Sequence, residues 1–189
     1  DRLPADTYSI FFEVFFSLLI NEFKTKIEKE FIIQKTIVEI ETTNHFSCID
    51  MIIENAGMQL TEKFIKELHF VLKNSTSDSR KDWFVVGNYK KLPNEVGGME
   101  TALPEDVAVK MKELLAGYNA KEEKTFEDIL DFHVKFERIH PFQDGNGRVG
   151  RLIMFKECLK YDIVPFIIED NQKLFYYRGL SEWDNERGY

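Results

Sequence analysis

The chain of 189 residues carries 33 acidic and 25 basic side chains, for a net charge of −8, and 43% of its residues are hydrophobic. This is a globular composition rather than a disordered or fibrous one, and the length suffices for one domain with its own core and a short extension. The acidic balance supplies no global positive field, so we expect neither nucleic acid nor an anionic membrane as a partner. A small basic pocket for a phosphorylated ligand is still compatible with it.

Two further patterns concern the compartment. Cys48 and Cys158 are isolated cysteines in apolar surroundings, without metal or redox spacing, which favours a reduced and cytoplasmic protein. The most apolar run, residues 10–20, is too short to cross a bilayer, contains Glu13 and lacks the features of a signal peptide. The chain begins at Asp1 without a Met, so we expect its natural start to lie upstream.

Apolar residues recur at helical spacing through most of the first 73 positions. This pattern predicts helices over residues 8–33 and 45–56, and a further helix over residues 61–73 that is capped by Thr61. We therefore expect residues 1–60 to form an N-terminal helical extension and residues 61–189 to form one globular core.

The pattern changes in the middle of the chain. A β-branched and aromatic run at residues 83–86 is followed by Gly, Asn and Pro residues up to Gly98, which predicts a β-hairpin over residues 83–98. Pro104, followed by two acidic residues, predicts the start of another helix that continues through Tyr118.

Residues that could act in catalysis or ligand binding are concentrated after Thr125. Thr125 and Asp128 form a predicted capping box, and the apolar spacing that follows predicts a helix that ends just before Pro141. A polar loop with the sequence HPFQDGNGRVGR comes next, and a second helix is predicted to include residues 152–160. The predicted fold class is all-α with a small β-hairpin.

The loop carries groups that suit a phosphorylated ligand. Gly145, Asn146 and Gly147 allow successive backbone N–H groups to point into one concavity at a helix start, which attracts phosphate. Arg148 and Arg151 are three residues apart, share a helix face and are placed to clamp a polyphosphate.

Three more residues of the loop have expected roles. The Asp144 carboxylate would repel a phosphate unless a cation lay between them, so we expect Mg²⁺ to be bound by this carboxylate and by phosphate oxygens. His140 is placed to take a proton from a hydroxyl near neutral pH, and Phe142 is expected to point inward and anchor the loop. Together these groups predict nucleotide-dependent transfer to a hydroxyl.

Each residue type alone has an ordinary structural explanation. A His at a helix end is usually a capping or surface residue, an Asp-Gly or Asn-Gly pair is usually a turn, and two arginines at this spacing usually lie on a solvated face. Their combination in one connection between helices favours a functional site, because such connections are normally short.

His140 to Arg151 matches every specified position of the motif His-x-Phe-x-(Asp/Glu)-Gly-Asn-Gly-Arg-x-x-Arg, so the chain resembles the Fic family from about Thr61 onward. The resemblance implies a small helical bundle with a β-hairpin flap beside the active loop, with residues 61–189 as the catalytic core. It also implies a protein adenylyltransferase, which transfers AMP from ATP to a Ser, Thr or Tyr hydroxyl of a target protein, or of itself, and releases pyrophosphate.

The resemblance assigns roles to single residues. His140 corresponds to the family's base, Asp144 to its Mg²⁺ ligand, residues 145–148 to its phosphate-binding loop, and Arg151 to the arginine that orients the terminal phosphate. The flap corresponds to residues 87–98, and its expected target-binding positions are Gly87, Tyr89, Val96 and Gly97. Lys90 stands where the family more often has Arg.

The sequence also departs from many Fic relatives. It contains no complete (Ser/Thr)-x-x-x-Glu-(Gly/Asn) inhibitory motif, and Ser9 to Glu13 and Thr101 to Glu105 match only its first part. The region around Glu41 and Thr42 lacks residues that such relatives often carry, so we expect that internal residues are absent from this chain.

Two alternatives to AMP transfer stay open from the sequence. One is transfer of another phosphoryl-bearing group, as in the Doc branch, although that branch alters the Gly-Asn-Gly-Arg loop that is intact here. The other is a toxin component or an inactive interaction module that is held by an antitoxin or by self-association.

Overall fold

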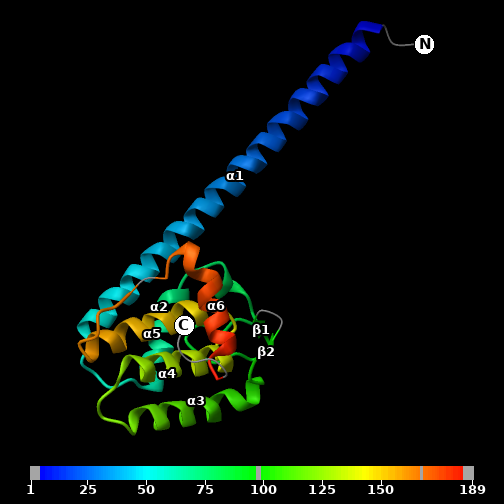
Figure 1. The fold of residues 1–189 in the computed structure, drawn as a ribbon. Helices are drawn as coiled ribbons and strands as arrows, with labels where there is room; N and C mark the ends of the chain where they lie inside the picture. Colours follow the sequence, from blue (N-terminus) through cyan, green and yellow to red (C-terminus); the bar gives the residue numbers. More distant parts are fainter. Residues whose placement is uncertain (1–4, 97–98, 167, 185–189) are drawn as a thin grey trace. The chain divides into compact units, whose positions relative to one another are not determined.

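The computed structural model describes residues 5–96, 99–166 and 168–184 (Figure 1). The backbone divides into two compact units, residues 1–40 and 41–189. All described residues of the first unit belong to one helix. The motif, and every contact discussed below, belong to the second unit.

Helices dominate the described part of the chain, as the sequence predicts. In chain order the elements are α1 (Ala5–Glu54), α2 (Glu62–Lys73), the 3₁₀ helix η1 (Asp78–Arg80), strands β1 (Glu95–Val96) and β2 (Met99–Glu100), α3 (Pro104–Asn119), α4 (Phe126–Ile139), α5 (Asn146–Lys160), the 3₁₀ helix η2 (Asp170–Gln172) and α6 (Lys173–Glu182). The mainly helical fold class is therefore confirmed. A search of the described residues finds no helix with the length and apolar content needed to cross a membrane.

Helix α1 is longer than the sequence pattern suggests. Two separate helical stretches were expected, over residues 8–33 and 45–56, whereas the structure has one helix from Ala5 to Glu54. Residues 34–44 contain neither Gly nor Pro. Nothing in the local sequence therefore interrupts the backbone hydrogen bonds between the two stretches.

The predicted helix ends around the motif are confirmed. The Thr61 side chain caps α2 by accepting a hydrogen bond from the backbone N–H of Phe64 at 3.2 Å. Thr125 and Asp128 form a complete capping box at the start of α4, which ends at Ile139 before Pro141. Local sequence signals thus determine where the motif loop begins.

The hairpin is shorter and lies later in the chain than predicted. Its strands pair Glu95 with Glu100 and Val96 with Met99, whereas residues 83–86 form turn and coil, so the prediction of a strand there is wrong. The Phe84 side chain is buried, and its ring lies 6.0 Å from that of His69, so this apolar run anchors a coil to α2. The Gly-Gly pair at positions 97–98, outside the described residues, is the stronger hairpin signal.

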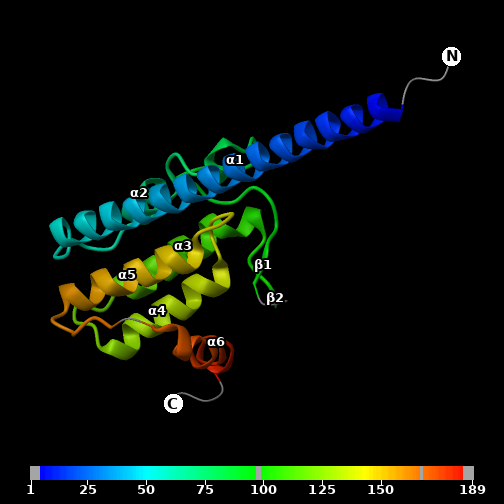
Figure 2. The ribbon, with the colours of Figure 1, turned by 90° about the horizontal axis from the view of Figure 1, so that it is seen from above.

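The core forms between the helices of the second unit. Helices α4 and α5 lie side by side, α3 packs against α4, and α2 packs against α5 (Figures 1 and 2). Buried side chains from these helices and from the end of α1 form one cluster, which includes Cys48, Ile52, Ile65, Leu68, Met111, Phe132, Phe136, Phe142, Val149 and Leu152. The α4–α5 connection is therefore held between two helix ends whose positions the core determines.

Helix α6, on which the sequence analysis made no prediction, is fastened to α4 by side chains. The His133 and Tyr176 side chains share a hydrogen bond between Nε2 and Oη at 2.7 Å. Trp183 Nε1 donates to Asp131 at 3.1 Å, and Arg138 Nη1 donates to Asp184 at 2.5 Å. These polar side-chain contacts join α6 and the residues that follow it to α4.

Candidate active site

His140 is the residue at which the chain leaves α4. Its backbone is left-handed, with φ 50° and ψ 61°, and its N–H donates to the carbonyl of Phe136 at 2.9 Å. A residue other than Gly rarely adopts this conformation, which costs free energy and is over-represented at functional sites. The His140 side chain is 15% exposed, so it is shielded but still accessible.

The ring of His140 is fixed by the backbone of its own helix. Nδ1 lies 3.2 Å from the carbonyl oxygen of Glu137. Because a carbonyl oxygen can only accept, the neutral ring carries its hydrogen on Nδ1 and leaves the Nε2 lone pair available. Burial lowers the pKa of His140 below its ordinary value, although the hydrogen bond to Glu137 opposes this. At pH 7 the ring is therefore neutral, which is the state that a general base requires.

Phe142 and Asn146 stabilise the loop through buried contacts within the protein. Phe142 is fully buried, and its ring stacks on the ring of His69 with centroids 3.9 Å apart. The Asn146 side chain accepts a hydrogen bond from the N–H of Phe142 and donates one to its carbonyl, both at 2.7 Å. The side-chain amide of Asn146 is thus hydrogen-bonded within the protein. Its backbone N–H, at the start of α5, remains as a donor for an anion.

The start of α5 has the backbone of an anion site. Gly145 is its N-cap with φ +82°, a conformation that Gly adopts without steric cost. The first backbone N–H groups of an α-helix have no partner within the helix, and the positive end of the helix dipole lies there. A Cβ on Gly147 would lie 3.3 Å from Nη1 of Arg151, so this guanidinium lies over the same turn. The structure therefore brings the Gly-rich turn and Arg151 together.

Arg148 lies between two carboxylates. Nη1 is 3.1 Å from Oε2 of Glu41, and Nη2 is 3.3 Å from Oδ2 of Asp144. A phosphate that binds Arg148 must share it with Glu41 or displace Glu41. The ion pairs of the described residues include none with Arg151.

Asp144 is ionised and half-exposed. Burial alone would raise the pKa of its carboxyl group. The hydrogen bond and charge of Lys73, the N–H of Gly145 and the charge of Arg148 together hold that pKa below its usual value. A negative carboxylate is thus present beside the start of α5 at neutral pH.

This carboxylate fits the Mg²⁺ that the sequence analysis expects. Both ion pairs of Asp144 are made by Oδ2, so Oδ1 has no ion-pair partner among the described side chains and can serve as a cation ligand. Within the described residues, no three His, Cys, Asp or Glu side chains are arranged to hold a metal without help. Mg²⁺ in nucleotide sites commonly takes one or two carboxylates together with substrate phosphates, and this donor set matches that pattern.

His69 and Lys73 on α2, which the sequence analysis did not single out, hold the motif loop through hydrogen bonds to Asp144. His69 Nδ1 accepts a hydrogen bond from the N–H of Gly87 at 2.9 Å, so Nε2 carries the ring hydrogen and donates to the carbonyl of Asp144 at 3.1 Å. Lys73 Nζ donates to Oδ2 of Asp144 at 2.6 Å. A signal existed in the sequence, because both are polar residues on the apolar face of an amphipathic helix, where they need partners.

The segment between Gly87 and β1 runs beside the motif loop. Among the described residues, four hydrogen bonds join the two stretches. The N–H of Lys90 donates to the carbonyl of Pro141 at 2.8 Å, and Asn94 Nδ2 donates to the carbonyl of Phe142 at 2.9 Å. The Gln143 amide accepts from the N–H of Leu92 at 3.2 Å and donates to its carbonyl at 3.3 Å. The expected position of a flap next to the active loop agrees with these contacts.

The expected target-binding positions lie at different places in this segment. Gly87 and Tyr89 are at its base, where Gly87 binds His69 and the Tyr89 ring lies 5.9 Å from that of Phe142. Val96 belongs to β1, and Gly97 lies outside the described residues. Gly87 and Tyr89 therefore help to hold the loop, and Val96 is the described position placed on a strand.

The two partial inhibitory motifs lie in different parts of the chain. Ser9 and Glu13 lie in α1, and their side chains are outside the described part of the structure. Thr101 accepts a hydrogen bond from Lys90 Nζ at 2.6 Å and donates to the carbonyl of Asn94 at 2.9 Å, so it fastens the flap segment. Glu105 is exposed in the first turn of α3.

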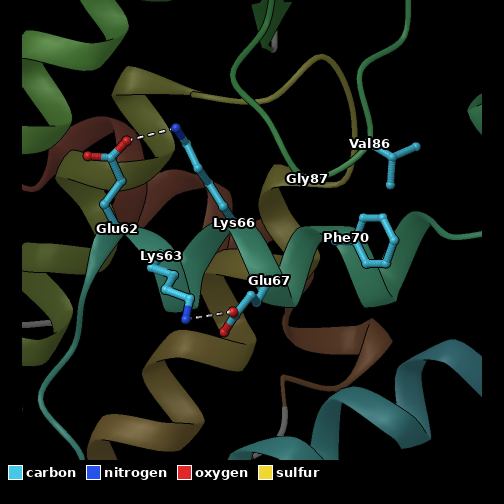
Figure 3. Close-up of a pocket in the computed structure, with 7 residues that line it drawn as sticks. All are labelled: Glu62, Lys63, Lys66, Glu67, Phe70, Val86 and Gly87. Carbon is cyan, nitrogen blue, oxygen red and sulfur yellow. Dashed lines mark ion pairs between the residues drawn. The ribbon is translucent and has the colours of Figure 1, made fainter.

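A surface hollow of about 600 Å³ lies along the outer face of α2 (Figure 3). Its charged lining residues pair with each other, Glu62 with Lys66 at 2.8 Å and Lys63 with Glu67 at 3.6 Å. Phe70 lies at one end, beside Gly87 (Figure 3). No motif residue lines this hollow, so the candidate site is the loop itself.

A sequence profile of the Fic/DOC family matches residues 59–158. The chain belongs to the Fic/DOC family. Its residues 140–151 therefore form a Fic motif, folded as the α4–α5 connection described above.

Individual Fic proteins agree with this assignment. The chain is 28% identical over 160 residues to "Protein adenylyltransferase Fic" of Drosophila mojavensis, a match that covers 78% of this chain and 32% of that protein. The protein of the same name from Drosophila melanogaster matches with the same identity and coverage. The chain thus spans about a third of the length of these curated relatives.

Solved Fic structures share the fold. A Fic domain-containing signaling protein from Bacteroides thetaiotaomicron is 31% identical with a TM-score of 0.68, over 79% of this chain and 58% of that one. A Fic family protein from Desulfovibrio desulfuricans is 26% identical with a TM-score of 0.60, over 76% of this chain and 45% of that one.

Proposed function

We propose that this Fic-family chain is a protein adenylyltransferase, which transfers AMP from ATP to a Ser, Thr or Tyr hydroxyl of a target protein and releases pyrophosphate. One observation carries the proposal: a neutral His140, with Nε2 available, lies at the start of the same loop that ends in the Gly-rich turn, Arg148 and Arg151. A base and a phosphate site within one connection suit transfer of a phosphoryl-bearing group to a hydroxyl. The names of the curated relatives support AMP as that group.

Each residue has a defined task in this reaction. Nε2 of His140 takes the proton of the target hydroxyl while its oxygen forms a bond to the α-phosphorus of ATP. The bond from the α-phosphorus to the bridging oxygen breaks, and its electron pair leaves with pyrophosphate. The N–H groups at the start of α5, together with Arg148 and Arg151, hold the leaving phosphates and offset their charge.

The proposed metal is Mg²⁺, held by Asp144 and phosphate oxygens, where it would neutralise phosphate charge. The proposed target lies as an extended segment along the hairpin. Exposed strand edges carry unpaired N–H and C=O groups that can pair with such a segment.

Isotope placement tests the proposal. The purified chain is incubated with Mg²⁺ and ATP labelled either at the α-phosphate or at the γ-phosphate, alone and with a cell lysate as a source of targets. We expect protein to take up the α-label and not the γ-label, and mass spectrometry to find an increase of one AMP. Uptake of the γ-label would indicate phosphorylation instead, and no uptake of either label would contradict the proposal.

A further inference from the structure

Lys73, the last residue of α2, lies outside the Fic motif, yet its side chain is completely buried. A buried lysine almost always needs a partner, because an ammonium group loses its hydration there. The partners of Lys73 are carboxylates from three other segments of the chain, and the most distant of them, Oε1 of Glu41 in α1, lies 4.0 Å from Nζ. Nζ lies 2.6 Å from Oδ2 of Asp144 in the motif loop and 2.7 Å from Oδ2 of Asp78 in η1.

Two residues of α2, one turn apart, form hydrogen bonds to the same motif residue. His69 donates to the backbone carbonyl of Asp144, and Lys73 donates to its carboxylate. Both Asp144 contacts come from the buried face of one helix. The position and the orientation of this carboxylate are thus set by α2 and not only by the loop that carries it.

The contact leaves one oxygen of Asp144 for another ligand. Oδ2 receives Lys73 and, at 3.3 Å, Arg148, whereas no described side chain forms an ion pair with Oδ1. Groups that hold a ligating carboxylate from behind commonly influence metal affinity as strongly as 10- to 100-fold. Lys73 has the geometry of such a group.

We propose that Lys73 is a positioning residue, which holds the Asp144 carboxylate by Oδ2 so that Oδ1 takes the divalent cation that arrives with the nucleotide. This inference rests on the proposed function, because that function supplies the nucleotide and the cation. The ordinary alternative is that Lys73 only neutralises its three carboxylate partners and stabilises the fold.

A matched pair of variants distinguishes a positioning role of Lys73 from a purely structural one. Lys73→Met keeps an unbranched side chain, one heavy atom shorter than that of Lys, and removes the contact to Asp144. Asp78→Asn removes the charge of another carboxylate that binds the same ammonium, and it leaves the Lys73–Asp144 contact in place. Both disrupt a buried ion pair, so both are expected to lower the melting temperature. In Lys73→Met, Asp144 keeps Arg148 and Asp78 keeps Lys81 at 2.6 Å, which favours a folded variant.

The measurement is binding of a non-hydrolysable ATP analogue by calorimetry over a series of Mg²⁺ concentrations. For Lys73→Met we expect the Mg²⁺ concentration for half-maximal binding to rise about 10-fold or more, while affinity in chelator stays within about three-fold of wild type. For Asp78→Asn we expect that concentration to stay within about two-fold of wild type. If Lys73→Met does not fold, Lys73→Gln, which keeps a donor but no charge, is expected to shift the Mg²⁺ requirement in the same direction.

Three results would overturn the inference: equal Mg²⁺ requirements in Lys73→Met and wild type, equal shifts in both variants, or wild-type binding that does not respond to Mg²⁺. Because binding is measured without turnover, failure of the proposed AMP transfer is recognised separately. In that case the wild-type chain binds the analogue with Mg²⁺ but transfers no α-label.

Discussion

At the level of single residues, the polar side chains of the Fic loop divide into those that build the loop and those that face its opening. Asn146 is occupied with the backbone of Phe142, so its amide serves the loop. His140 has Nδ1 bound to the Glu137 carbonyl and Nε2 available. Arg148 is paired with Glu41, which lies far from the motif in the sequence.

His140→Ala should abolish transfer while leaving the phosphate site intact. A general base typically contributes about 100- to 10,000-fold in rate, so we expect a loss of that order. Binding of a non-hydrolysable ATP analogue should stay within about two-fold, since His140 is not expected to hold the phosphates. Labelling at the wild-type rate by a folded Ala variant would refute the role of His140.

Glu41→Gln should strengthen nucleotide binding. The Glu41 carboxylate is 3.1 Å from Arg148 and about a third exposed, so a phosphate competes with a partly solvated ion pair. Such pairs are worth at most about 1 kcal/mol, which corresponds to an increase in affinity of about two- to five-fold. Glu39→Gln, on the exposed side of the same helix, is the control. Weaker binding in Glu41→Gln would instead mean that Glu41 orients Arg148 for its ligand.

At the level of elements, the site is supported by α2 and by the flap segment, which runs from Gly87 to β1. Helix α2 provides His69 and Lys73 beneath Asp144. The flap segment is joined to the loop through Lys90 and Asn94. Neither support is visible in the motif itself, because the residues that make these contacts lie in other segments of the chain.

Val96→Pro tests whether the hairpin holds the target. Val96 pairs with Met99 in the two-residue strands, and Pro would remove its backbone N–H and disturb the strand. We expect protein labelling to fall at least several-fold, while ATP affinity stays within about two-fold because the phosphate site is not touched. If a folded variant labels protein normally, the hairpin only covers the loop.

At the level of the whole molecule, the second unit buries two neutral histidines. Burial lowers the pKa of His69 and of His133 to about 4 each, and both carry hydrogen bonds to other segments. The unfolded chain, with histidines near their ordinary pKa of 6.5, takes up these protons first as the pH falls. Acid therefore favours unfolding between about pH 6.5 and 4 through these groups.

His69→Gln should reduce this sensitivity. The stability that neutral His69 contributes is fully present above pH 6.5 and is lost as the pH falls toward 4. Between pH 7 and 4.5 we expect the free energy of unfolding of wild type to fall by on the order of 2 kcal/mol more than that of the variant. Urea unfolding at the two pH values measures this difference. The buried groups His133 and Glu137, whose pKa values are also shifted, are present in both proteins, so their contributions cancel in the comparison. Equal changes in the two proteins would contradict a buried neutral His69.

The sequence alone determined the helical class, the capped ends of α2 and α4 and the complete Fic motif, because these depend on residues close together in the chain. It also placed His140 at the end of α4, since Pro141 disfavours the helical conformation in the residue before it. The tertiary structure decided which distant residues serve the loop: Glu41 on Arg148, His69 and Lys73 on Asp144, and Asn94 on Phe142. It also shortened the hairpin, predicted over residues 83–98, to the strands Glu95–Val96 and Met99–Glu100, while Phe84 is buried beside His69 of α2. These outcomes depend on packing between segments far apart in the chain, which local residue patterns do not encode.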